Sequence, residues 1–187
     1  MTLMSCKGNK DQHFRPYFAP KSIDILKATY NGNPLILSKT NLLEFYGQPS
    51  SEIKNCVTIS NLTSNQNIQY DCWTYQQISR FGFDIYKNIG YLSYVSFRNT
   101  ATQINYPEIK FSSQTTLNDI KRQFPKTYNL KILGNEDGLI IVSLNDNLMT
   151  QEHESANIIE LGFKNGFLDY YKYQIEPEYW SNFQFPK

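Results

Sequence analysis

The stretch SKTNLLEFYGQPS at residues 38–50 returns in outline seventy-five residues later, as SQTTLNDIKRQFP at 113–125. Matching positions carry the same or a similar residue type: Ser38/Ser113, Thr40/Thr115, Leu42/Leu117, Glu44/Asp119, Phe45/Ile120 and Gln48/Gln123. The apolar residues recur at the spacing of one helix face, and a proline ends each stretch. The repetition predicts that one structural unit is used twice.

Each copy predicts a short helix at the start of its unit. Thr40 and Thr115 are expected to cap the two helices, because a threonine side chain accepts a hydrogen bond from the backbone of the first turn. Leu42 and Phe45 are expected to pack on a sheet. Gly47 favours the turn that ends the first helix.

The segments after each helix predict consecutive antiparallel strands. They lie at about 53–60, 67–75, 82–88 and 90–98 in the first half, and about 128–134, 138–144, 156–164 and 166–174 in the second. Asn31-Gly32 marks another hairpin, because this dipeptide supplies positive φ angles. The predicted class is α+β: a tandem pseudo-repeat of a short helix plus an antiparallel meander, with the helices on one face of the sheet. Three segments follow: a tether at 1–20, a first repeat at 21–113, and a second repeat with a C-terminal tail at 114–187.

Composition limits the function classes. The 187 residues include 18 Lys+Arg against 17 Asp+Glu, for a net charge of +1. That balance lacks the basic field of a nucleic-acid binder, so no nucleic-acid partner is expected. A content of 40% hydrophobic and 15% aromatic residues is typical of a globular domain. No apolar run reaches the length of a membrane span.

The N-terminus resembles a bacterial lipobox. Leu3-Met4-Ser5 precede Cys6, and the polar segment KGNKDQ follows as a tether would. Only five residues precede Cys6, fewer than a working signal peptide needs. Either translation starts upstream of Met1 or the match arises by chance. The first alternative predicts lipidation at Cys6 and a membrane-anchored protein of the bacterial periplasm; the second leaves the protein in the cytoplasm.

Two further cysteines flank a predicted turn. Cys56 and Cys72 lie in the strand-like runs NCVTIS and IQYDCW. A hairpin centred on Ser64 places them opposite each other, near the separation that a disulfide requires. The alternative is a pair of buried thiols, which a one-residue shift in register would separate. A disulfide would indicate an oxidising compartment, in agreement with the lipobox.

The sequence offers little for catalysis. The two histidines, His13 and His153, are not at metal-ligand spacing to another His or Cys. Nucleophile-elbow, phosphate-loop and zinc motifs are not found. We therefore expect no enzyme activity, no metal site and no cofactor.

Strand alternation predicts an aromatic surface. Pairing around Asn165-Gly166 puts Leu168 and Tyr170 inside, and pairing around Asn88-Ile89 puts Tyr94 inside. The outward face then collects tyrosine, tryptophan and one acid: Trp73, Tyr75, Tyr86, Tyr91, Glu160, Tyr171 and Tyr173. Such residues are enriched at interface hot spots, so they are predicted to bind a partner protein. The alternative is that tyrosines simply favour strands.

The helix followed by Gly-x-Pro and a meander resembles the small αβ modules of the SmpA/OmlA lipoprotein and beta-lactamase-inhibitor-protein group. TNLLEFYGQP at 40–49 resembles the helix that begins such modules in its initial threonine and its Gly-x-Pro end, whereas TTLNDIKRQFP at 115–125 lacks the glycine. The resemblance implies a helix-backed antiparallel sheet that binds proteins, and it provides no catalytic residue to carry over.

Three functions compete. The first is a non-enzymatic bacterial envelope module that binds a protein, in its sharpest form an inhibitor or immunity protein against a toxin or hydrolase. The second is a structural or assembly lipoprotein that docks to an outer-membrane complex through a Cys6 anchor. The third is a small-ligand or enzymatic domain, which would need a deep pocket lined by convergent polar groups.

Overall fold

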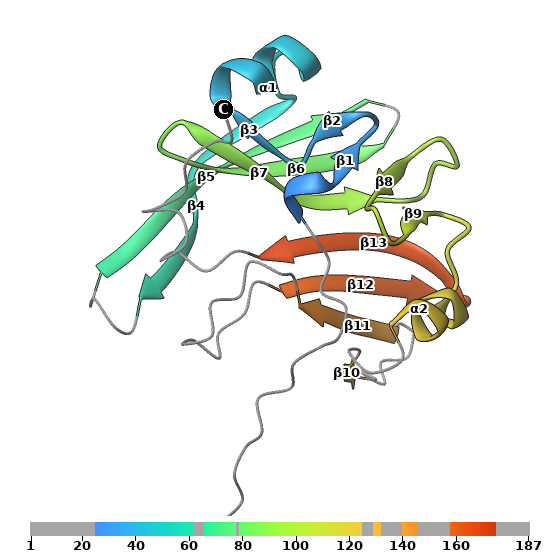
Figure 1. Cartoon of the computed structure of the whole chain (residues 1–187). Coiled ribbons are helices and arrows are strands. Elements are labelled where there is room, and N and C mark those ends of the chain that lie inside the picture. Colours follow the sequence, from blue (N-terminus) through green and yellow to red (C-terminus); the bar gives the residue numbers. More distant parts are fainter. Residues whose placement is uncertain are drawn as a thin grey trace, which may run out of the picture.

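Two antiparallel sheets organise the chain (Figure 1). The computed structural model describes residues 25–61, 66–77, 79–124, 129–131, 140–145 and 158–174. The large sheet contains, in spatial order, β10 (Asn129–Lys131), β11 (Ile140–Asn145), β12 (Ile158–Lys164), β13 (Phe167–Gln174), β7 (Ile89–Ser96), β6 (Arg80–Tyr86), β5 (Gln66–Gln76) and β4 (Ser51–Asn61). A ninth strand, β3 (Ile36–Ser38), pairs with β7.

The strand order divides the large sheet at its centre. Strands β4 to β7 follow one another along the chain and in space, and so do β10 to β13. The last strand of each set meets the other, because β7 pairs with β13 through Tyr94↔Lys172, Val95↔Tyr171 and Ser96↔Tyr170. The two sets therefore join end strand to end strand.

A small sheet covers part of the large one. It orders β2 (Asn33–Pro34), β1 (Thr29–Tyr30), β8 (Gln103–Asn105) and β9 (Lys110–Ser112), and the short helix η1 (Ile25–Lys27) precedes it. Asn31 and Gly32 have φ angles of 49° and 90°, so the predicted hairpin turn is confirmed. The Tyr30 ring packs 5.0 Å from Phe81 on the large sheet.

Both helices begin at a capping residue other than the one predicted. α1 (Lys39–Tyr46) is capped by Ser38, whose Oγ accepts from the backbone N–H of Asn41 at 3.1 Å. α2 (Leu117–Gln123) is capped by Thr116 instead of Thr115, in a reciprocal capping box with Asp119. Two residues with a hydroxyl lie near each start, Ser38 and Thr40 in the first and Thr115 and Thr116 in the second, and the sequence alone does not say which hydroxyl takes the cap.

The helix α1 contacts the sheet through a different residue set from the one predicted. Leu42 is fully buried, as expected, and lies against Gly90 of β7, where any larger side chain would collide with it. Phe45 is 45% exposed, so its predicted packing on the sheet is wrong, and Tyr46 is buried in its place. Tyr46 packs edge-on to Phe81. Within the described residues, the predicted coarse class holds: mainly antiparallel sheet with two α-helices.

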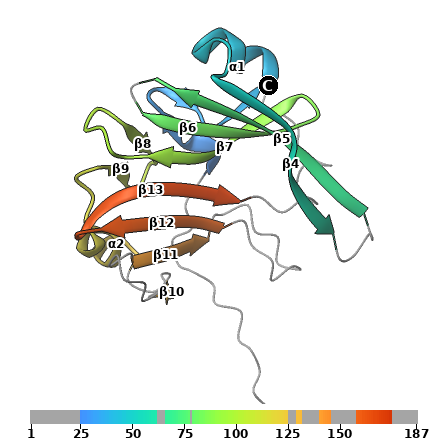
Figure 2. The ribbon, with the colours of Figure 1, turned by 180° about the vertical axis from the view of Figure 1, so that it is seen from behind.

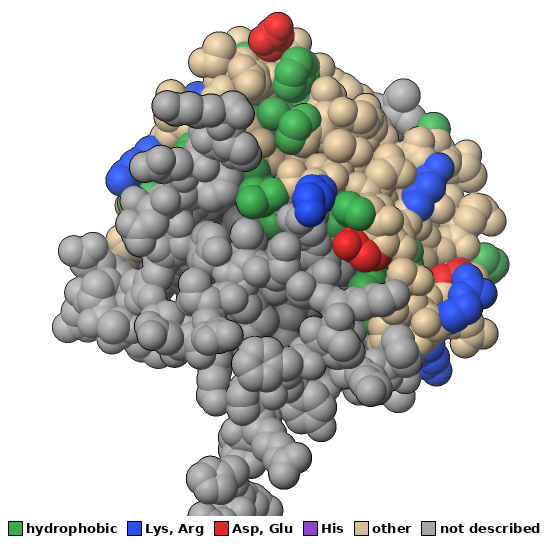
Figure 3. Space-filling view, viewed as in Figure 1, with side chains coloured by type: hydrophobic (Ala, Val, Ile, Leu, Met, Phe, Trp, Pro, Cys, Tyr) green, Lys and Arg blue, Asp and Glu red, His purple; other side chains and the backbone are tan. Residues whose placement is uncertain are grey.

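Several predictions fall outside the described residues: the tether at 1–20 with Cys6 and His13, the histidine at His153, and the tail at 175–187. The described helices include none that is long and apolar enough to cross a membrane. Figure 3 shows the described part of the Figure 1 side as mainly uncharged, with separate basic and acidic side chains rather than one charged patch.

Candidate functional site, an open tyrosine face of the sheet

A β-bulge in the β6–β7 hairpin decides which tyrosine faces solvent. Phe83 pairs with Leu92, but Gly82 pairs with Tyr94, so Ser93 is an extra residue in β7. One inserted residue reverses the alternation beyond it. Val95 is therefore buried against the core, and Tyr94 lies half-buried on the opposite side. The prediction that Tyr94 faces the core is wrong for this reason.

The β12–β13 hairpin contains the same irregularity. Phe163 pairs with Leu168, but Gly162 pairs with Tyr170, which leaves Asp169 as the extra residue. Tyr170 turns to the side opposite the core and lies half-buried. Its ring fills the space over Gly162, since a Cβ on that glycine would overlap the tyrosine ring. The predicted inward orientation of Tyr170 is therefore also wrong.

The two bulges bring their tyrosines together across the central strand pair. The rings of Tyr94 and Tyr170 stack with centroids 6.3 Å apart and an interplanar angle of 25°. We call this side of β6, β7, β13 and β12 the open face. In Figure 2 α1 lies above β6 and β7, and β13 and β12 lie below them. Alternation and pairing assign to the open face Arg80, Asp84, Tyr86, Tyr94, Ser96, Glu160, Tyr170 and Lys172.

The same bulges bury tyrosines that were predicted to be exposed. Tyr171 is fully buried and its hydroxyl lies 2.9 Å from that of Tyr106. Tyr173 is 2% exposed. Both lie beyond the extra residue in β13, where the alternation has reversed, and they pair with the buried Leu161 and Ile159. Their predicted place on an exposed face is therefore wrong.

Trp73 and Tyr75 are also buried rather than exposed. They pair with Phe83 and Phe81 of β6, which places them on the core side of the sheet. The Tyr75 ring stacks on Phe81 at 5.0 Å. Both faces of β5 carry apolar or aromatic residues, so alternation within the strand did not identify the core side.

Of the remaining predicted residues, two lie on the open face and one is covered. Glu160 and Tyr86 are half-buried there. Tyr91 is only 1% exposed, because the rings of Tyr70 and Tyr173 pack edge-on against it. Its predicted exposure is wrong, and no described feature tests partner binding by any of these residues.

The open face carries opposite charge arrangements in its two halves. The Tyr170 hydroxyl donates a hydrogen bond to Glu160 Oε1 at 2.8 Å. Burial raises the pKa of this hydroxyl most, and the hydrogen bond to Glu160 raises it further. Lys172 pairs with Glu160 across the strands. On the first-half side, Arg80 and Arg98 line a cavity of about 310 Å³ beside Tyr94. Aromatic and arginine side chains gathered on one rigid sheet are typical of protein-binding surfaces.

Asp84 is a half-buried acid of the open face. It accepts hydrogen bonds from Ser93 Oγ at 2.8 Å and from the Tyr91 hydroxyl at 3.1 Å. Desolvation raises the pKa of its carboxyl, and the bonds from Ser93 and Tyr91 and the charge of Lys172 oppose that shift. The two hydrogen bonds therefore fix the position of the Asp84 carboxyl beside Tyr91 and Ser93.

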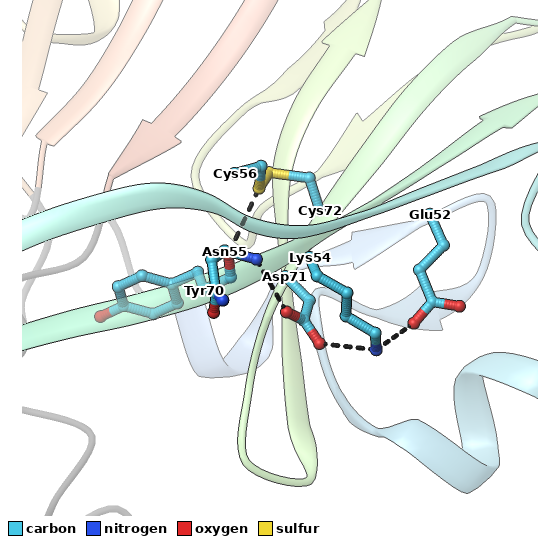
Figure 4. Close-up of polar contacts among 7 residues, drawn as sticks. All are labelled: Glu52, Lys54, Asn55, Cys56, Tyr70, Asp71 and Cys72. Atoms are coloured by element: carbon cyan, nitrogen blue, oxygen red, sulfur yellow. Dashed lines mark hydrogen bonds and ion pairs between the residues drawn. A yellow bond between two sulfur atoms is a disulfide. The ribbon is translucent and has the colours of Figure 1, made fainter.

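The predicted Cys56–Cys72 disulfide is present, with a Cα–Cα distance of 5.8 Å. It does not arise from the predicted register. The pairing jumps from Ile53↔Cys72 to Val57↔Tyr70, so three residues of β4 oppose one residue of β5. This bulge moves Cys56 to within reach of Cys72. In Figure 4 the bond lies across the bend of β4.

Polar contacts hold the β4 bulge. Asn55 has a φ of 51°, and its backbone N–H donates to Asp71 Oδ1 at 3.0 Å. Lys54 lies between two carboxylates, 2.9 Å from Asp71 Oδ2 and also bonded to Glu52 (Figure 4). Hydrogen bonds from Lys54 and Asn55 outweigh desolvation and hold the pKa of Asp71 below its usual value. The Cys56 sulfur lies 3.4 Å from the Tyr70 carbonyl oxygen, a contact without a donated proton because the sulfur is oxidised.

The sequence contained a signal for the residues that were missed. Gly82 and Gly162 interrupt otherwise apolar strands, and glycine inside a strand often marks a bulge or a close approach. A bulge at the glycine in Phe81-Gly82-Phe83 and in Leu161-Gly162-Phe163 would have predicted that Tyr94 and Tyr170 face away from the core. Among the residues described, no group of three or more His, Cys, Asp or Glu side chains is arranged to hold a metal ion.

Comparison with known proteins adds one distant likeness. No protein-family model matches the chain. No curated protein matches it. Among solved structures, it is similar to a candidate beta-lactamase inhibitor protein from Streptococcus mutans, at 17% identity over 73% of this chain and 82% of that one. The TM-score is 0.25, which is too low to assign a shared fold, so no property is transferred. The resemblance to the SmpA/OmlA group stays a prediction.

Proposed function

We propose that the chain is a non-enzymatic module that binds another protein through the open face. The observation that carries this proposal is the Tyr94–Tyr170 stack, held half-exposed at the centre of the large sheet by two bulges. Tyrosine offers a large contact area and a hydroxyl at a small entropic cost. Both rings are fixed before binding, so little ordering remains when a partner docks.

The sharpest form of the proposal is an inhibitor or immunity protein in the bacterial envelope. The Cys56–Cys72 disulfide supports the location, because structural disulfides persist in oxidising compartments. Lipidation at Cys6 would add an anchor. A preformed sheet face suits an inhibitor, which must cover a folded surface without unfolding itself.

The proposal includes a structural repeat. Two bulged hairpins with glycine, an extra residue and an outward tyrosine occupy corresponding places in the two halves. Both tyrosines flank the Val95↔Tyr171 pair at the centre of the β7–β13 ladder. If a two-fold axis relates the halves, it passes near the Val95↔Tyr171 pair, and the open face extends to both sides of that axis.

The test is affinity capture from the envelope of the encoding organism, followed by binding measurements with the purified partner. Tyr94→Ala and Tyr170→Ala are the test variants, and Phe45→Ala is the matched control, since Phe45 is an exposed aromatic on α1. We expect each tyrosine variant to lose about tenfold or more in affinity, as at a binding hot spot. Melting curves check that every variant is folded. Wild-type affinity in both tyrosine variants would overturn the proposal.

A further inference from the structure

The cavity beside Tyr94 has a composition that the tyrosine face alone does not explain. Its volume is about 310 Å³. It lies where β6 begins and β7 ends, at the edge of the open face. Its lining consists of Ser79, Arg80, Tyr94, Ser96, Arg98 and Asn99. Two of these six side chains are permanently cationic, and none is acidic.

The two guanidinium groups have no counter-charge within the described part of the chain. Arg80 and Arg98 are both exposed, and the ion pairs found there involve Lys54 and Arg122 instead. Two like charges on one cavity wall repel each other. An anion between them would relieve that repulsion and accept hydrogen bonds from both forks.

The neutral groups of the cavity also favour an anion. Asn99 Oδ1 accepts from the backbone N–H of Ala101 at 2.9 Å, so its carbonyl is occupied and its NH₂ group remains to donate. The Ser79 hydroxyl is hydrogen-bonded to the Thr102 hydroxyl. The wall therefore presents the donors of Arg80, Arg98 and Asn99, and its lining includes no acidic side chain.

We propose that this cavity binds a carboxylate side chain from an acidic segment of the protein partner. The inference rests on the proposed function, because it places the segment next to the Tyr94–Tyr170 stack. A single carboxylate fits two arginines on a chain whose net charge is only +1, whereas a polyanion would require a wider basic field. The Tyr94 ring forms the wall shared by the cavity and the open face, so one peptide can contact both.

A titration tests the cavity without knowledge of the partner. The probe is a blocked Glu-Glu dipeptide, added to the full ¹⁵N-labelled chain while the side-chain Nε–H signals of Arg80 and Arg98 are followed. We expect saturable shifts at both arginines that disappear in Arg98→Ala and persist in Lys164→Ala, which removes an exposed cation elsewhere. Inorganic phosphate forms a second arm. No saturable shift with the dipeptide, or tighter binding of phosphate, would overturn the proposal.

The captured partner separates this inference from the proposed function. With that partner, Arg80→Ala and Arg98→Ala are each expected to reduce affinity about tenfold and to flatten its salt dependence. If Tyr170→Ala weakens binding but both arginine variants bind normally, the carboxylate site is wrong and the proposed function stands. If neither the tyrosine nor the arginine variants change binding, both are wrong. The control Lys164→Ala is expected to bind like the wild type.

Discussion

The β6–β7 and β12–β13 hairpins use one backbone device and carry different chemistry. Each has a glycine flanked by apolar residues, an extra residue on the opposite strand and a tyrosine turned to the open face. The residue two before the glycine is Arg80 in the first hairpin and Glu160 in the second. Tyr170 donates to its acid, whereas Tyr94 stands beside cationic side chains.

The difference indicates which features belong to the scaffold and which belong to recognition. Glycine and bulge set the direction of the tyrosine in both hairpins, so they are scaffold features. The charge next to each tyrosine varies, and it gives the open face a cationic edge on one side only. A partner would then bind in one orientation.

The largest expected effect concerns a feature that the first half alone shows, the Cys56–Cys72 disulfide. Replacing both cysteines by alanine makes the first half resemble the second. The bond closes a loop with a sequence separation of 16. Its removal is expected to lower the free energy of unfolding by about 3 kcal/mol, since the unfolded chain gains freedom.

Urea unfolding of the oxidised wild type and the double variant measures this loss. Wild type treated with a reductant serves as the control and is expected to match the variant. Equal midpoints for oxidised wild type and variant would show that the disulfide does not constrain the fold.

The second prediction contrasts the two glycines. Gly162→Ala places a Cβ in overlap with the Tyr170 ring, so the ring must leave its position. Gly82→Ala places its Cβ 3.4 Å from the Trp73 carbonyl oxygen, an ordinary contact. We expect a loss of about 2 kcal/mol in the first variant and under about 0.5 kcal/mol in the second, measured by urea unfolding.

A rescue variant tests the cause. In Gly162→Ala combined with Tyr170→Ala the collision is absent, so part of the lost stability is expected to return. If Gly82→Ala lowers the free energy of unfolding as much as Gly162→Ala does, the collision with the Tyr170 ring is not the cause of the loss.

Sequence reasoning predicted the strands well and their faces poorly, for a physical reason. Strand positions follow from turn residues such as Asn31-Gly32 and Asn165-Gly166, which are local signals. Facing depends on register, and one extra residue such as Ser93 or Asp169 reverses it. The disulfide was predicted from proximity in a hairpin, although a bulge at 54–56 brings the cysteines together. Burial of Tyr91 depends on Tyr173, which is distant in sequence, so no local pattern indicated it.

The third prediction compares the two tyrosine hydroxyls. Tyr170→Phe removes the hydrogen bond to Glu160 and is expected to cost about 1 kcal/mol, since the acceptor is charged but partly solvated. Tyr94→Phe removes a hydroxyl for which no hydrogen bond is found in the described part of the chain, so its cost is expected to stay under about 0.5 kcal/mol. Thermal unfolding of the two variants side by side measures the difference. Equal losses would mean that the Glu160 bond contributes nothing specific.

The smallest expected effect concerns the residue after each bulge pair, Asp84 in the first hairpin and the exposed Lys164 in the second. Desolvation raises the pKa of Asp84 above that of an exposed aspartate, so the folded state holds its proton to higher pH than the unfolded state does. Between those two pKa values the unfolded state binds fewer protons, and stability falls as pH rises. Asp84→Asn removes that dependence and keeps an acceptor for Ser93.

Melting temperatures of wild type and Asp84→Asn across the acid range to neutrality test this sign. The wild type is expected to lose stability relative to the variant as pH rises through the raised pKa, and the difference then levels off. Lys164→Gln is the matched control at the corresponding place in the second hairpin, and its difference from wild type is expected to stay flat over the same range. The opposite result would be a wild type whose melting temperature rises relative to that of Asp84→Asn as the pH rises. It would mean that Ser93, Tyr91 and Lys172 stabilise the Asp84 carboxylate more than burial destabilises it. Asp84 would then be a favourable charge of the open face.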